Sequence, residues 1–156
     1  MKKRIQLLLG ATLIVFMGLG QAFGQVSLAT DNASNYGGTW ANGDNEGTGF
    51  GTWSLSSSGS GGNYIGDTGL PGTDTSFGIY AGGGTGSDPI NELVATRNFS
   101  SQIDINHTIS FDFGHTGIDT GGEIGFTLYS GGSYRMNFKF VGGETVYKLN
   151  DGGGRF

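Results

Sequence analysis

The feature that most constrains the fold is a strict alternation of apolar and polar residues in the second half of the chain. Apolar side chains occupy every second position in three successive runs, at 109–113, 124–128 and 134–140. This is the period of a β-strand with one apolar and one polar face. Ser130-Gly131-Gly132-Ser133 joins the second and third runs, and glycine supplies the positive φ that a short hairpin turn needs. The sequence therefore predicts antiparallel strands here, with a fourth at 146–149.

Shorter runs of the same kind predict strands at 49–56, 63–66, 76–81 and 92–99. No segment beyond the first two dozen residues holds an apolar period of 3.6 over three turns, so no helix is available to cover an apolar sheet face. A second sheet is the remaining cover. We therefore expect an all-β fold, an antiparallel β-sandwich of the jelly-roll kind, with these side chains in its core: Phe111, Phe113, Phe126, Phe138 and Phe140.

The N-terminus has the order of a secretory signal peptide. Lys2, Lys3 and Arg4 precede an apolar run at 7–19, and small residues follow at Ala22 and Gly24. The apolar run is shorter than the roughly 20 residues that cross a bilayer, and no second apolar stretch follows. We expect a signal-peptide helix within residues 1–24, cleavage after Ala22 or Gly24, and one secreted, extracellular or cell-surface domain at 25–156 without a membrane span.

Charge and cysteine content exclude several functions. Without the leader, five basic residues face thirteen acidic ones, a net charge of −8. Such a chain repels phosphate backbones, so no nucleic-acid partner is expected. Cysteine is absent, which excludes thiol catalysis and thiolate metal sites.

The last residues, 152–156, read Gly-Gly-Gly-Arg-Phe and resemble a loop between strands. We therefore expect a domain that is incomplete at its C-terminus. Its edge strand would present unpaired backbone to solvent or to a neighbour, and self-association through that edge is one hypothesis for its partner.

Aromatic residues in polar surroundings are the candidates for ligand binding. Trp40 lies among Gly38, Thr39, Asn42 and Gly43, and a flat ring in a polar loop can stack on a sugar. Tyr36 and Asn42 are the accompanying candidates. Packing of Trp40 at the edge of the core is the alternative.

Asp44, Asn45 and Glu46 are the candidate metal ligands, because an acidic loop can offer several oxygen atoms to calcium. Their spacing matches no EF-hand loop, and solvated turn residues are the alternative, so calcium is a hypothesis and no cofactor is certain. The carboxylates Asp112, Asp119, Glu123 and Glu144 form no compact acid motif, and His107 and His115 are expected to be polar residues at strand ends. No catalytic residue is predicted.

Several motifs carry a resemblance to a known group. They are Asp31-Asn32-Ala33-Ser34-Asn35-Tyr36, Trp40, Asn42-Gly43, Gly47-Thr48-Gly49-Phe50, Trp53, Leu55, Ile118-Asp119-Thr120-Gly121-Gly122-Glu123-Ile124-Gly125-Phe126 and Phe140-Val141-Gly142-Gly143-Glu144. In these the chain resembles secreted bacterial surface proteins with concanavalin A-like or laminin G-like jelly rolls, many of which carry C-terminal sorting tails. The resemblance implies a jelly roll at the cell surface. It also implies binding of sugars or surface polymers, in some cases with calcium.

Together these observations predict a secreted, non-enzymatic β-sandwich of the surface or matrix that binds polysaccharide or a cell-surface polymer. Two alternatives stay open. One is a non-catalytic module or fragment of a secreted carbohydrate-active hydrolase. The other is an assembly subunit that acts through its edge strand.

Overall fold

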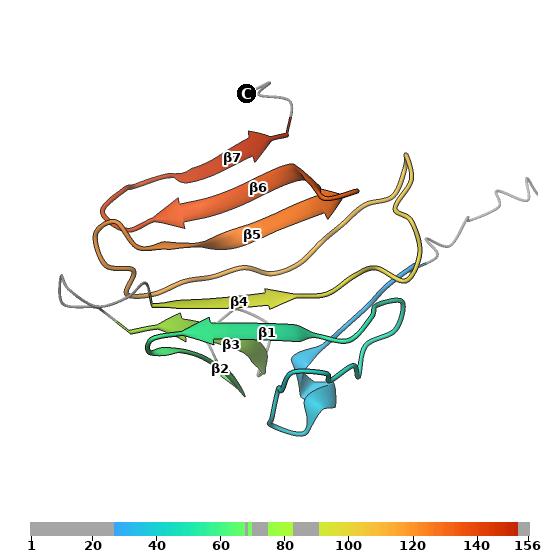
Figure 1. Cartoon of the computed structure of the whole chain (residues 1–156), viewed down its shortest axis with the longest axis horizontal. Helices are drawn as coiled ribbons and strands as arrows, with labels where there is room; N and C mark the ends of the chain where they lie inside the picture. The colour runs from blue at the N-terminus through green and yellow to red at the C-terminus, as the bar shows by residue number, and fades with distance from the viewer. Residues whose placement is uncertain (1–26, 68, 70–74, 83–90, 153–156) are drawn as a thin grey trace, which may run out of the picture.

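The computed structural model describes residues 27–67, 69, 75–82 and 91–152 (Figure 1). The predicted signal peptide at 1–24 and most of the terminal loop at 153–156 lie outside these residues. The described elements are η1 (Ala33–Tyr36), β1 (Ser54–Ser58), β2 (Gly61–Gly66), β3 (Ser76–Ala81), β4 (Glu92–Thr96), β5 (Glu123–Ser130), β6 (Ser133–Val141) and β7 (Tyr147–Asp151). In the part of the chain that the structure describes, no helix is long and apolar enough to cross a membrane.

All strand pairs are antiparallel, which confirms the prediction of an all-β antiparallel fold. β1 pairs with β4, β2 pairs with β3, and β5, β6 and β7 form a three-stranded sheet in that order. Gly131 and Gly132 both have positive φ, 59° and 78°, as expected for the tight turn between β5 and β6. The two most regular alternating runs of the sequence therefore became the longest hairpin of the fold.

The predicted strand at 109–113 is wrong. Residues 108–116 belong to no strand, and they make no backbone hydrogen bond to any described residue. In Figure 1 this stretch nevertheless runs smoothly and extended, opposite in direction to β5. We call it the unpaired segment. Its alternation identified an extended conformation and an apolar side correctly, but alternation does not supply a pairing partner.

The most buried side chains lie in the first half of the described chain. Ala33, Tyr36 and Trp40 are at most 6% exposed. Phe77 of β3 contacts the rings of Tyr36, Trp40 and Trp53, with centroids 4.9 to 5.6 Å apart. This cluster joins η1 and the loop after it to the β2–β3 pair, so the core of the described fold is aromatic.

One face of the β5–β6–β7 sheet is apolar and stays largely open. Its side chains, which we call the apolar face, are Ile124, Phe126, Leu128, Met136, Phe138, Phe140, Tyr147 and Leu149. Tyr147 and Leu149 are 48% and 45% exposed. The expected core role of Phe111 is wrong, because this ring is 51% exposed, and Phe113, Phe126, Phe138 and Phe140 are only half-buried. The reason is that no second sheet covers this face among the described residues.

Candidate functional site

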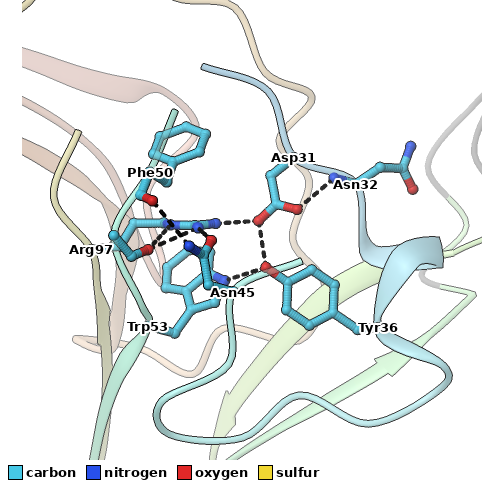
Figure 2. A network of polar contacts seen from close by, with 8 residues as sticks. Asp31, Asn32, Tyr36, Asn45, Phe50, Trp53 and Arg97 are labelled. Carbon is cyan, nitrogen blue, oxygen red and sulfur yellow. Dashed lines mark hydrogen bonds and ion pairs between the residues drawn. The ribbon is translucent and has the colours of Figure 1, made fainter. Parts of the chain in front are cut away.

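The most connected polar group in the described structure is centred on Arg97 (Figure 2). Its guanidinium forms an ion pair with Asp31, and the two side chains are only 6% and 9% exposed. It also donates to the carbonyl oxygen of Gly51 at 2.9 Å and to Oδ1 of Asn45 at 2.5 Å. We call Asp31, Tyr36, Asn45, Trp53 and Arg97 the Arg97 network.

Aromatic rings and further hydrogen bonds complete this network. The Arg97 guanidinium carbon lies 4.2 Å from the ring centroid of Phe50 and 4.5 Å from that of Trp53, so the cation is stacked between two rings. Tyr36 donates its hydroxyl to Asp31 at 2.7 Å, and Trp53 Nε1 donates to the Tyr36 oxygen at 3.1 Å. The donors and acceptors at its centre are therefore used within the chain, as a buried charge requires.

The predicted ligand-binding residues lie in or beside this aromatic core. Trp40 and Tyr36 are each 6% exposed, and Trp40 packs against Trp53 with centroids 5.0 Å apart. Asn42 accepts a hydrogen bond from the backbone N–H of Leu55 at 2.9 Å. Neither ring presents an open face in this conformation, so sugar stacking on Trp40 and Tyr36 stays a prediction without geometric support.

The predicted calcium ligands do not converge on one point. Asp44 accepts from the backbone N–H of Ala41 at 2.8 Å, and Asn45 is engaged by Arg97 and donates to the Phe50 carbonyl at 3.0 Å. Glu46 is exposed. Among the described residues, no group of three or more histidine and carboxylate side chains is placed to hold a metal ion. The oxygen atoms of Asp44 and Asn45 thus stabilise the loop around Arg97.

The other four carboxylates considered in the sequence, Asp112, Asp119, Glu123 and Glu144, are also dispersed. Glu123 forms an ion pair with Lys139, and Glu144 forms one with Lys148, both at 2.7 Å. Asp112 and Asp119 are exposed. This arrangement is that of solvated sheet faces and turns.

The remaining feature is the contact between the unpaired segment and the apolar face. Phe111 contacts Phe126 with centroids 4.2 Å apart, and Phe113 contacts Phe138 at 5.5 Å. The side chains at 111 and 113 share one side of the extended backbone. The segment therefore lies against the sheet, like the first strand of a second layer, while its backbone groups have no partner among the described residues.

His115 belongs to the same contact. Its ring stacks on Phe140 with centroids 4.0 Å apart and lies 5.6 Å from Tyr147, and its buried Nδ1 has no hydrogen-bond partner. The expectation of a polar residue at a strand end is wrong, because His115 packs on rings. Its sequence parity with Phe111 and Phe113 was the feature that could have revealed this.

An open cavity of about 360 Å³ lies at this junction. Seven residues line it: Phe111, Phe113, Phe126, Met136, Phe138, Tyr147 and Leu149. All are apolar or aromatic, and several are about half exposed. Such a surface favours an apolar occupant. The unpaired segment and the apolar face together are thus the candidate functional site.

Comparison of the chain with protein-family models, with curated proteins and with solved structures found no match. The function is therefore argued from this site alone.

Proposed function

We propose that this chain is a non-enzymatic surface β-domain that assembles with an extended polypeptide by β-strand addition. One observation carries the proposal: the segment 108–116 is extended and packed on a sheet, yet its backbone makes no hydrogen bonds to the described residues. Unpaired strand edges recruit further strands. Export to the cell surface or beyond is part of the proposal and rests on the leader motif at residues 1–24.

The backbone supplies the affinity of such an assembly. In an antiparallel pair, alternate residues face a given neighbour and each exchanges two hydrogen bonds with it, so one edge of this nine-residue segment offers about eight hydrogen bonds. Each contributes on the order of 1 kcal/mol.

The apolar face supplies the second contribution. An added strand beside the segment would place alternate side chains over Phe138, Tyr147 and Leu149, two of which are about half exposed. Burial of apolar area contributes about 25 cal/mol per Å². In this proposal the two-layer sandwich expected from the sequence is completed when a partner is bound.

Polysaccharide binding is less well supported than assembly. The rings expected to stack on sugars are in the aromatic core, whereas the exposed aromatic surface is bordered by unpaired backbone. A sugar would use the rings but would leave the backbone groups to water. A polypeptide strand uses both.

A strand-addition assay tests the proposal. The probe is a fluorescent peptide that alternates threonine and valine, with a lysine at each end, and its anisotropy is followed as dilute protein is added. Ser110→Pro removes one backbone N–H from the segment, and Ser110→Val keeps that N–H. Binding by the parent chain and Ser110→Val, with loss in Ser110→Pro, is expected. No binding by the parent chain at concentrations where it is a monomer, or equal binding by all three, would refute strand addition, and the unfolding midpoint of each variant controls for folding.

A further inference from the structure

We infer that the strand that adds to the segment is β7 of a second copy, so that the chain forms a reciprocal dimer. The inference rests on the proposed function and names its partner. In this dimer the segment 108–116 of each copy pairs antiparallel with Tyr147–Asp151 of the other.

The positions of the two elements make the exchange reciprocal. β5 and β7 are the two edge strands of their sheet among the described strands, and of these only β7 carries a cation, Lys148, that can face Asp112. The unpaired segment lies against the apolar face of that same sheet, as the contact of Phe113 with Phe138 shows. Each copy thus offers an edge strand in one layer and a lone strand in the other. A twofold axis parallel to the strands, between the layers, brings each lone strand beside the other copy's β7. Every layer then holds four strands, and both apolar faces are covered.

Chain direction agrees with this symmetry. β5 and β7 are parallel to each other, since both are antiparallel to β6. In Figure 1 the unpaired segment runs opposite to β5 and β7. A twofold axis parallel to the strands preserves their direction, so the segment of one copy and β7 of the other meet antiparallel.

Contacts within one chain limit the register between chains to two possibilities. The same axis keeps every residue at its own level along the strands. Phe111 contacts Phe126, which lies level with Phe138 and Leu149 in the sheet. Phe113 lies between this level and that of Tyr147, with ring centroids 5.5 Å from Phe138 and 6.1 Å from Tyr147. Either Phe111 or Phe113 can therefore face Leu149. We adopt the first register because it places opposite charges together, and its pairs across the dimer are Phe111 with Leu149, Asp112 with Lys148, and Phe113 with Tyr147.

This register is chemically matched on both faces. Leu149 and Tyr147 meet phenylalanines on the inner side, and Lys148 meets Asp112 on the outer side, where opposite charges across strands stabilise a pair. Asp112 has no ion-pair partner among the described residues. Lys148 is 44% exposed and pairs with Glu144, so it can serve both carboxylates. Pairing of two unpaired segments centred on Asp112 would place two carboxylates opposite each other, which disfavours that alternative.

Disulfide trapping tests the pairing directly, because the native chain contains no cysteine. Asp112→Cys and Lys148→Cys are made as separate variants, mixed and oxidised. A covalent dimer is expected in the mixture and not with either variant alone. Ser57→Cys, on the exposed β1, replaces Lys148→Cys in the control mixture and is expected to give no dimer above background. Absence of the link in the first mixture, or an equal yield in the control, would overturn the register.

A charge exchange tests the same contact without cysteine. Asp112→Lys or Lys148→Asp alone should raise the dimer dissociation constant by about tenfold, because two charge pairs change in each dimer. The double variant Asp112→Lys/Lys148→Asp should restore dimerisation, which a folding defect would not do. The measurement is sedimentation velocity over a concentration series.

The outcomes separate the two proposals. A chain that is monomeric throughout the series but binds the threonine–valine peptide refutes the dimer and leaves strand addition standing. A monomer that binds no peptide refutes both. A dimer that is unaffected by either charge variant refutes this pairing, whatever the peptide does.

Discussion

Replacing Asp31 with asparagine should destabilise the fold more than any change to its surface charges. The carboxylate accepts hydrogen bonds from the Arg97 guanidinium and the Tyr36 hydroxyl on one oxygen, and from the Asn32 backbone N–H on the other. An amide has one acceptor atom and no charge, so in either orientation it turns an NH₂ group toward a donor. Arg97 would then be a buried cation without its counter-charge.

The expected loss is about 3 kcal/mol of unfolding free energy, at the lower end of the cost of breaking a buried ion pair. This is a large share of the roughly 5 to 15 kcal/mol that stabilises a domain. Urea unfolding followed by tryptophan fluorescence measures it. Of the two tryptophans of the chain, Trp53 belongs to the Arg97 network and Trp40 packs against Trp53, so the signal reports on the altered region.

Glu123→Gln is the matched control. It also removes one carboxylate from an ion pair, but the Lys139 and Glu123 side chains of this pair are 27% and 54% exposed. Exposed ion pairs contribute at most about 1 kcal/mol to stability. Asp31→Asn and Arg97→Met should be non-additive, with a coupling of about 1.5 to 3 kcal/mol in a double-mutant cycle. If Asp31→Asn lies within about 0.5 kcal/mol of the parent, or couples no more strongly than Glu123→Gln with Lys139→Met, the pair does not hold this core.

Three further substitutions test the fold. Trp40→Ala should cost about 3 to 5 kcal/mol by emptying the aromatic core; a normal urea midpoint, together with loss of glycan-array binding shown by the parent, would instead make Trp40 a ligand residue. Gly125→Ala should cost about 1 to 3 kcal/mol, because the new Cβ would overlap the Phe138 carbonyl oxygen across the hairpin. Gly131→Ala, whose Cβ would meet open space at a φ of 59°, should cost about 1 kcal/mol from backbone strain alone. Equal unfolding midpoints for the two glycine variants would contradict the close approach at Gly125.

The sequence predicted best those elements whose pairing is local. The runs at 124–128 and 134–140 are joined by Ser130-Gly131-Gly132-Ser133, and Ser130 pairs with Ser133 as expected for a tight hairpin. Here alternation, turn chemistry and proximity in the chain all favour one register. The prediction of β5 and β6 therefore needed no knowledge of the rest of the fold.

Features that depend on distant contacts were predicted poorly. The neighbours of Trp40 in sequence are polar, but its neighbours in space are Trp53 and Phe77. The pair between Asp31 and Arg97 joins residues 66 positions apart. The local sequence held one indication of this pair. Arg97 falls on the same side of the alternating run as Leu93, Ala95 and Phe99. A cation on the apolar side of a strand needs a buried counter-charge, and this rule could have directed the search toward an acidic partner.

The two parts of the described chain satisfy their polar groups in opposite ways. Around Arg97, each charge and hydroxyl at the centre has its partner within the chain, so these groups need no partner from a second molecule. In the unpaired segment, the backbone groups have no hydrogen-bond partner among the described residues, and the charged side chain of Asp112 lies at the centre of the segment. A carboxylate in the middle of an open edge repels a second copy of the same edge, and the net charge of −8 over residues 25–156 disfavours nonspecific contacts between copies. An incoming strand with a cation opposite Asp112 and apolar residues on either side reverses that repulsion. Asp112 thus favours strands that place a cation opposite it. Within this chain β7 is such a strand, because Lys148 is flanked by Tyr147 and Leu149.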